Sequence, residues 1–410
     1  MVTAVSSNLY NISSSIQSNA TLNRAVMEVG GIEIPFAIMA NNRDERIERF
    51  IRASFFVTAS FVAPVVTMPM LNKFFLKKAD IIKNDKEVDI LRVSKEFLIK
   101  DSKKMAEGFS ETAKELQIRD KNKFKDVDKH FNNVLERFAD KEVLRNKLVK
   151  AHNKIFLADF LVASISAIAV PWVSNFITEK RTKRSGYVGE FKIADENYTD
   201  KMSEKHDSLK ASKIGVSVAV PILASFGISK ALSNAMLKPE EKLGQIGKFL
   251  KKNAHMFDYK NTRFMSRAGY FAVMLAGDMP SYMLACRDKH ELKMRATGWA
   301  FALAMLFGGD FVLNNLVGRV SDAKLGTNLM NKKGYENAGF FKKFLMGTNS
   351  LDKISQMGKA AKKTKNAALI MYWGNFALTT VLLGFGLPFV TNRQMKKDVK
   401  KDLEQQKINA

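Results

Sequence analysis

The chain has 410 residues and a formal net charge of +25 at pH 7. A basic excess of this size favours anionic partners, which are phospholipid head groups or nucleic acid. With a single cysteine the chain cannot form an intramolecular disulfide. Residues 1–23 contain no Lys or Arg and no long apolar core, so we expect no cleavable signal peptide.

Apolar residues gather into six runs, although the mean hydropathy of −0.15 is low for a membrane protein. About 20 apolar residues are needed for a helix to cross a bilayer. The three runs that best meet this length are 54–71, 155–177 and 366–392. The other three are 214–237, 269–286 and 297–318. The run at 269–286 is the weakest candidate, because it places Asp278 near the middle of the bilayer.

We therefore predict an all-α, multi-pass membrane protein of about six apolar helices, several of them kinked by proline, with a soluble helical insertion. The expected segments in chain order are a polar leader (1–50), the first apolar helix (51–71), the insertion (72–154), helices two and three with a basic loop (155–237), a basic amphipathic helix (238–268), an apolar hairpin (269–318), a basic connector (319–365), the last apolar helix (366–392) and a basic tail (393–410). Basic residues flank every run at both ends, so the orientation is left open.

The insertion at 72–154 has the spacing of amphipathic helices. Apolar residues recur three and four apart at Phe124, Val127, Phe131, Val134, Leu135 and Phe138. Ser102 and Asp140 are the expected helix caps. We expect three or four soluble helices here, which offer a surface to a protein partner.

A second amphipathic pattern follows Pro239. Leu243, Ile246, Phe249 and Leu250 form one face, and lysines form the other. This pattern is typical of a helix on an anionic membrane surface, and equally of a surface helix packed on its own protein. Both interpretations stay open.

Two of the long runs share a pattern. Asp159-Phe160 leads to a segment from Pro171 to Asn175, and Asn375-Phe376 leads to a similar segment from Pro388 to Asn392. In both cases a basic stretch follows. The match is short, but it suggests an internal duplication.

No recognisable catalytic, metal or cofactor motif is present. His290-Glu291 begins like a zinc-protease helix but lacks the second histidine, and Cys286 has no spaced partner. We therefore expect no cofactor and no metal, and a catalytic role is unsupported. A membrane enzyme with dispersed catalytic residues would escape such a search.

Ionisable residues inside the apolar runs are the best functional candidates: Asp278, Asp310, Lys230 and Asp159. Such residues are candidate proton or cation sites, and the glycines beside Asp278 and Asp310 could interrupt their helices as in many transporters. The alternative, which we favour, is that these two aspartates cap helices or pair with Lys230. Asp159 and Lys230 could also reach the membrane surface from the segment ends.

Four basic residues after the second run are candidate lipid head-group ligands: Lys180, Arg181, Lys183 and Arg184. Nucleic-acid binding is disfavoured, because no aromatic or helical reader accompanies the charge. Three function classes remain. The first is a structural or interaction role in a membrane, the second a small-solute or ion transporter or channel, and the third a peripheral protein that binds anionic lipid.

Overall fold

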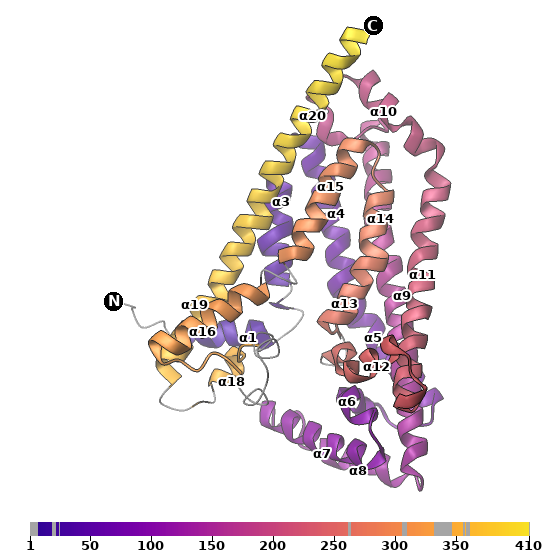
Figure 1. Cartoon of the computed structure of the whole chain (residues 1–410), viewed down its shortest axis with the longest axis vertical. Coiled ribbons are helices and arrows are strands. Elements are labelled where there is room, and N and C mark those ends of the chain that lie inside the picture. Colours follow the sequence, from indigo (N-terminus) through magenta and orange to yellow (C-terminus); the bar gives the residue numbers. More distant parts are fainter. Residues whose placement is uncertain are drawn as a thin grey trace. The chain divides into compact units, whose positions relative to one another are not determined.

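The computed structural model describes residues 7–18, 22–23, 25–260, 264–305, 310–331, 347–355, 357 and 361–409. The predicted all-α class is confirmed (Figure 1). The one sheet in the described residues pairs two strands of two residues each, β1 (Tyr259–Lys260) and β2 (Phe264–Met265). Residues 332–346 of the predicted basic connector lie outside the description.

The chain divides into two compact units that each combine several stretches of sequence. Unit 1 contains residues 1–57, 174–209 and 286–410, and unit 2 contains 58–173 and 210–285. The helices of unit 1 are α1 (Ser7–Ser18), η1 (Ala25–Glu33), α3 (Ile34–Ile38), α4 (Arg43–Val57), the end of α9 (Lys141–Thr182), η4 (Val188–Glu190), α10 (Glu196–Ser208), α15 (Lys289–Leu303), α16 (Asp310–Leu325), α18 (Leu351–Ser355), α19 (Ala361–Thr379), η9 (Thr380–Gly386) and α20 (Leu387–Asn409).

Unit 2 holds the helical insertion and several of the apolar runs. Its helices are η2 (Thr58–Val62), α5 (Ala63–Lys78), η3 (Asp85–Arg92), α6 (Lys95–Leu98), α7 (Ser102–Arg119), α8 (Val127–Glu136), most of α9, α11 (Lys210–Leu237), η5 (Glu240–Lys242), α12 (Gln245–Lys252), η6 (Ala254–Phe257), α13 (Arg267–Val273), η7 (Met274–Asp278) and α14 (Met279–Leu284).

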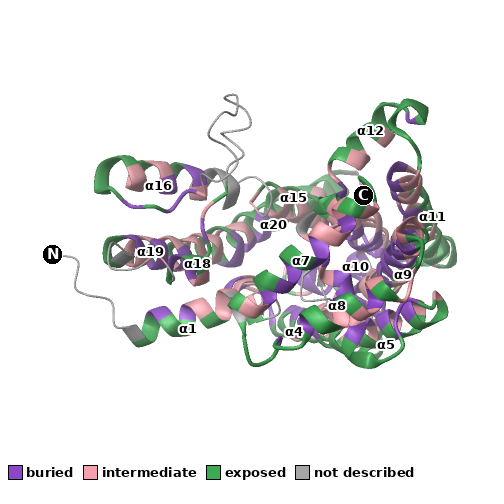
Figure 2. Cartoon of the chain, turned by 90° about the horizontal axis from the view of Figure 1, so that it is seen from below, coloured by how far each residue is buried: buried purple, intermediate pink, exposed green. Residues whose placement is uncertain are grey.

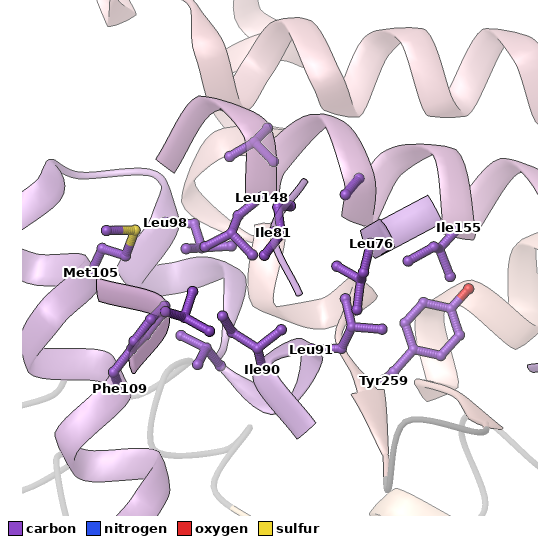
Figure 3. Packing of buried hydrophobic residues seen from close by; sticks show 14 of the residues in the cluster. Leu76, Ile81, Ile90, Leu91, Leu98, Met105, Phe109, Leu148, Ile155 and Tyr259 are labelled. Atoms are coloured by element: carbon purple, nitrogen blue, oxygen red, sulfur yellow. The ribbon is translucent and has the colours of Figure 1, made fainter. Parts of the chain in front are cut away.

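An extensive apolar core holds unit 2 together (Figure 3). Phe124, Val127, Phe131 and Val134, from the predicted stripe, are buried in it, and Leu135 and Phe138 pack against it. Leu148 and Ile155 of α9 meet this core, and so does Tyr259 (Figure 3). The predicted amphipathic face is therefore confirmed.

The helix caps of this region are partly as predicted. Asp140 Oδ1 accepts a hydrogen bond from the backbone N–H of Glu142 at 2.8 Å, which caps the start of α9. The cap of α7 is Asp101 rather than Ser102, because its Oδ1 accepts from the N–H of Lys104 at 2.7 Å. Ser102 is instead the first residue of that helix.

Two smaller apolar clusters lie in unit 1. One joins α1, α18 and α19 through Tyr10, Leu351 and Leu369. The other joins the η4–α10 region to α15 and α20 through Tyr187, Met294 and Val399. Figure 1 shows α15 and α20 side by side.

Four helices among the described residues are long and apolar enough to cross a membrane, not six. They are Arg43–Lys78, Lys141–Thr182, Lys210–Leu237 and Lys362–Ile408. The predicted run at 269–286 forms α13, η7 and α14, which carry Asp278 and fall short of this criterion. The run at 297–318 is divided between α15 and α16, and residues 306–309 lie outside the description.

Proline explains where the long helices widen. Each of the π-helical segments η1, η2, η7 and η9 ends two residues before a proline: Pro35, Pro64, Pro280 and Pro388. Proline has no N–H and its ring clashes with the carbonyl four residues earlier. In all four cases that carbonyl belongs to the π-helical segment, where the wider turn relieves the clash.

Two of these widened segments touch each other inside unit 1. A Cβ added to Gly384 of η9 would lie 2.6 Å from the carbonyl oxygen of Gly31 in η1. Gly31 is also the residue whose carbonyl Pro35 cannot bond. Glycine at both positions lets the backbones approach, as small residues do between packed membrane helices.

Candidate functional site

Two pairs of opposite charges lie one helical turn apart on α4. Arg49 Nη2 donates to Glu45 Oε1 at 2.5 Å, and Arg52 Nη2 donates to Glu48 Oε1 at 2.9 Å. The spacing explains both pairs, since residues i and i+4 are neighbours on one helix face. All four side chains are buried, and buried charges persist only where they are paired.

Arg287, just before α15, joins these pairs across unit 1. Its Nη1 and Nη2 donate to both carboxylate oxygens of Glu48 at 3.0 and 2.9 Å, and its Nε donates to Glu291 Oε2 at 3.1 Å. Burial alone would lower the pKa of Arg287, but the carboxylates of Glu291 and Glu48 outweigh it and raise that pKa well above its ordinary value. The guanidinium therefore stays charged and holds both carboxylates.

Glu291 is the point where these charges converge. Arg52 lies 4.0 Å and Arg295 lies 3.6 Å from Glu291 Oε1. The hydroxyl of Tyr187 donates to Glu45 at 2.8 Å at the other end of the group. The buried ion network, as we name it below, consists of Glu45, Glu48, Arg49, Arg52, Arg287 and Glu291.

Two asparagines from the repeated sequence pattern contact the network. Asn175 accepts a hydrogen bond from Arg52 Nη2 at 3.1 Å, and Asn392 accepts one from Arg49 Nη2 at 3.1 Å. Each asparagine lies four residues after the proline of its own apolar run. The sequence echo thus corresponds to two equivalent contacts with α4.

Glu190 lies wholly buried at the end of η4. Neither of its carboxylate oxygens has a hydrogen-bond partner among the described residues. Burial, followed by the negative charges of Asp288 and Glu291, raises the pKa of Glu190 to about 9. The carboxyl is therefore protonated at neutral pH and leaves the neighbouring ion pairs undisturbed.

A second titratable group adjoins Glu190 at the start of α15. Asp288 Oδ1 caps the helix by accepting from the N–H groups of His290 and Glu291, both at 2.8 Å. Burial and the charge of Glu291 raise the pKa of Asp288 to about 6. His290 Nε2 lies 3.2 Å from Asp402 Oδ2, and burial lowers the pKa of this histidine.

The chemistry open to this site is charge pairing and proton binding. Two guanidinium groups, those of Arg52 and Arg287, and two carboxylates, those of Glu48 and Glu291, tie α4 to the start of α15. Glu190 and Asp288 can each bind a proton, because their pKa values are raised to about 9 and about 6. Across the residues that the structure describes, no group of three or more His, Cys, Asp or Glu side chains could hold a metal ion.

None of the four ionisable residues predicted inside the apolar runs is among the six residues of the network. Asp159 is buried in α9 and accepts a hydrogen bond from the Tyr259 hydroxyl at 3.0 Å. Asp278 is buried at the end of η7, and Lys230 is exposed on α11. Asp310 is the first residue of α16, and its side chain lies outside the description.

The basic residues predicted to bind lipid head groups divide into two kinds. Arg181 Nη1 pairs with Asp44 at 2.6 Å, and Arg184 Nη2 donates to Thr199 at 2.6 Å. Lys180 and Lys183 are exposed, although the ammonium of Lys180 also lies 4.5 Å from the ring centre of Phe176. Arg181 and Arg184 therefore have partners inside unit 1.

The buried ion network was not predicted from the sequence. Residues 42–49 fall within the predicted polar leader, and His290-Glu291 matches only an incomplete zinc motif. The sequence does carry a signal for the network. Two Glu–Arg pairs spaced i, i+4 come directly before the first apolar run, and residues 287–291 form a dense group of charges between the apolar runs at 269–286 and 297–318. Charges so close to apolar runs favour pairing with each other.

Comparisons with protein families, with curated proteins and with solved structures gave no match. The class that the fold defines is an all-α protein in which four helices of the described residues are long and apolar enough to span a membrane.

Proposed function

We propose that this chain is an integral, multi-pass membrane protein with a structural or interaction role. The observation that carries the proposal is the exposure of its apolar helices. In the most apolar stretch of each candidate span only 11%, 17% and 28% of residues are buried for Arg43–Lys78, Lys210–Leu237 and Lys362–Ile408. Lys141–Thr182 is more central, with 50% buried.

Many of the exposed side chains on three of these helices are large and apolar. They include Val62, Val66, Met70, Leu223, Phe226, Val381, Phe389 and Val390. Soluble proteins rarely leave apolar surfaces of this extent in water. Lipid acyl chains are the surroundings that suit them.

Contacts within each unit support one further membrane crossing, by the run at 269–286. In unit 2, Ser94 of the insertion donates to Asp258 at 2.6 Å, so residue 258 lies at the end of the bundle where the first span ends. In unit 1, Arg287 binds Glu48, which lies where that span begins. The intervening helices α13, η7 and α14 cover 267–284, a length of about 27 Å at 1.5 Å per residue. We infer that this run crosses as well.

The proposed role follows from what each unit carries. The buried ion network would join α4 to α15, and the insertion at 72–154, with its own apolar core, would present a stable surface to a protein partner. Buried ion pairs are best understood as fixing which elements meet, rather than as a source of net stability.

Membrane extraction tests this function. Membranes from cells that express the tagged chain are washed with high salt and then with alkaline carbonate. Retention through carbonate is the expected result. Release by salt alone would favour the peripheral anionic-lipid-binding alternative, and a soluble protein from the start would overturn the membrane assignment.

A second candidate function is transport of a small solute or ion through the acids of the apolar runs. Asp278 favours it, because this buried residue ends a π-helical segment, and such segments are frequent at functional sites. A Cβ added to the preceding Gly277 would lie 3.0 Å from Ser164 Oγ, so the backbone there is closely packed. Asp278→Asn and Asp310→Asn should abolish uptake into proteoliposomes if the chain is a transporter, and should leave a scaffold unchanged.

A further inference from the structure

The short helix α12 carries two opposite faces. Three apolar residues recur at spacings of three and four: Ile246, Phe249 and Leu250. Three basic residues repeat the same spacing: Lys248, Lys251 and Lys252. With 3.6 residues per turn, each set occupies one side of the helix, and the two sets are displaced to opposite sides.

The apolar side of α12 faces outward. Ile246 is 76% exposed and Phe249 is 62% exposed, while Leu250 and the preceding Leu243 are at least partly buried. Figure 2 shows α12 next to α11 in unit 2, with exposed residues along both helices. Packing on its own protein therefore leaves most of the apolar face of α12 uncovered.

We propose that α12 lies in the interface of an anionic membrane, with Ile246 and Phe249 among the acyl chains and its lysines at the lipid phosphates. The inference rests on the proposed function, because it requires the chain to be in a bilayer. A helix with an apolar face and a lysine-rich polar face is the form that binds in this way.

The position of α12 selects lipid as the occupant. The candidate span α11 ends at Leu237, and only residues 238–244 separate it from α12. Leu223 of α11 is itself 73% exposed, so the uncovered apolar surface continues from α12 onto this span. A span that ends at the membrane surface leaves the following helix beside head groups.

Charge complementarity makes those head groups anionic. Residues 238–252 contain five lysines, Lys238, Lys242, Lys248, Lys251 and Lys252, against Glu240 and Glu241. Basic clusters next to a membrane helix are attracted to anionic lipids, and the attraction falls with salt. Lysine side chains can also extend from a buried stem to the phosphate level.

Site-directed spin labelling of the full chain in lipid nanodiscs tests the proposal. In a Cys286→Ser background, one label is placed at Ile246→Cys and a control label at Lys248→Cys on the opposite face. Collision with oxygen reports the acyl region, and collision with a water-soluble nickel chelate reports the aqueous phase. Nanodiscs contain phosphatidylcholine alone or mixed with phosphatidylglycerol.

With phosphatidylglycerol, the label at 246 should meet mainly oxygen and the label at 248 mainly nickel, and the contrast should shrink without the anionic lipid. Replacing Lys248, Lys251 and Lys252 with Gln should remove the dependence on lipid charge. Equal nickel access at both positions would overturn the proposal. Exclusion of both reagents at 246 would do so too, and would indicate a protein partner or a second copy. Carbonate extraction of the same variants separates these outcomes from failure of membrane insertion.

Discussion

The two units of this chain hold their helices together by different means. Unit 2 buries a continuous apolar core between the helical insertion and α9, whereas unit 1 combines two smaller apolar clusters with a network of buried charges between α4 and α15. Unit 2 is not free of buried charge, since Lys95 donates to the Phe257 carbonyl at 2.6 Å. The contrast is therefore one of degree.

The difference teaches what each region is suited to do. Apolar packing is non-directional and tolerates many sequences of similar volume, so it provides stability. Ion pairs are directional and costly to desolvate, so a buried network adds little net stability but penalises any arrangement that leaves one charge unpaired. In unit 1 the network thereby specifies which helix ends come together.

Removing Arg287 should have the largest effect, because Arg287→Ala leaves Glu48 and Glu291 buried without this partner. Breaking one side of a buried pair costs about 3–5 kcal/mol. The free energy of unfolding is followed in detergent by circular dichroism on heating. Reaction of a thiol-specific dye with Cys286, the single cysteine, which is buried in unit 1, reports that unit separately.

Lys293→Ala on the same helix is the matched control for Arg287→Ala. Lys293 pairs with Asp398 at 2.6 Å, but its side chain is 58% exposed. A pair of this kind contributes roughly 0–1 kcal/mol. If the two variants melted together, the network would have no special role in unit 1.

Truncating the core of unit 2 should cost slightly less and act elsewhere. Leu148→Ala removes a fully buried side chain that packs in the core, and such changes cost about 2–5 kcal/mol. Hydrogen exchange should quicken in α7 and α8, while the dye reacts with Cys286 at an unchanged rate. Val143→Ala, at an exposed position of the same helix, is the control. Equal acceleration of Cys286 labelling would mean that the two units unfold as one.

The same contrast separates what could be predicted from sequence. Hydrophobic periodicity is local, so the stripe from Phe124 to Phe138 and four of the six apolar runs were found correctly. Glu48 and Arg287 are 239 residues apart, and no local pattern indicates that they meet. The charge of Asp278 makes the run at 269–286 the weakest candidate in the sequence, and α13, η7 and α14 fall short of the criterion that those four runs meet.

The last predicted effect concerns Glu190 and depends on pH. Its pKa is about 9 in the folded protein against an ordinary value of 4.5, so folding keeps the carboxyl protonated. The stability associated with this proton is complete below about pH 4.5 and is lost as pH rises towards 9. Glu190→Gln cannot ionise, so it should match the wild type below about pH 4.5 and exceed it in Tm by an amount that grows as pH rises from 4.5 towards 9.

Glu404→Gln, at an exposed position of α20, should leave the wild-type pH profile unchanged. A Glu190→Gln variant that was less stable by the same amount at every pH would mean that the carboxylate itself binds a partner. The proton-holding interpretation of Glu190 would then be wrong. A difference in Tm that appears only as pH rises would instead show that unit 1 tolerates this acid because the carboxyl remains neutral beside the ion pairs. An apolar core such as that of unit 2 does not depend on such a protonation.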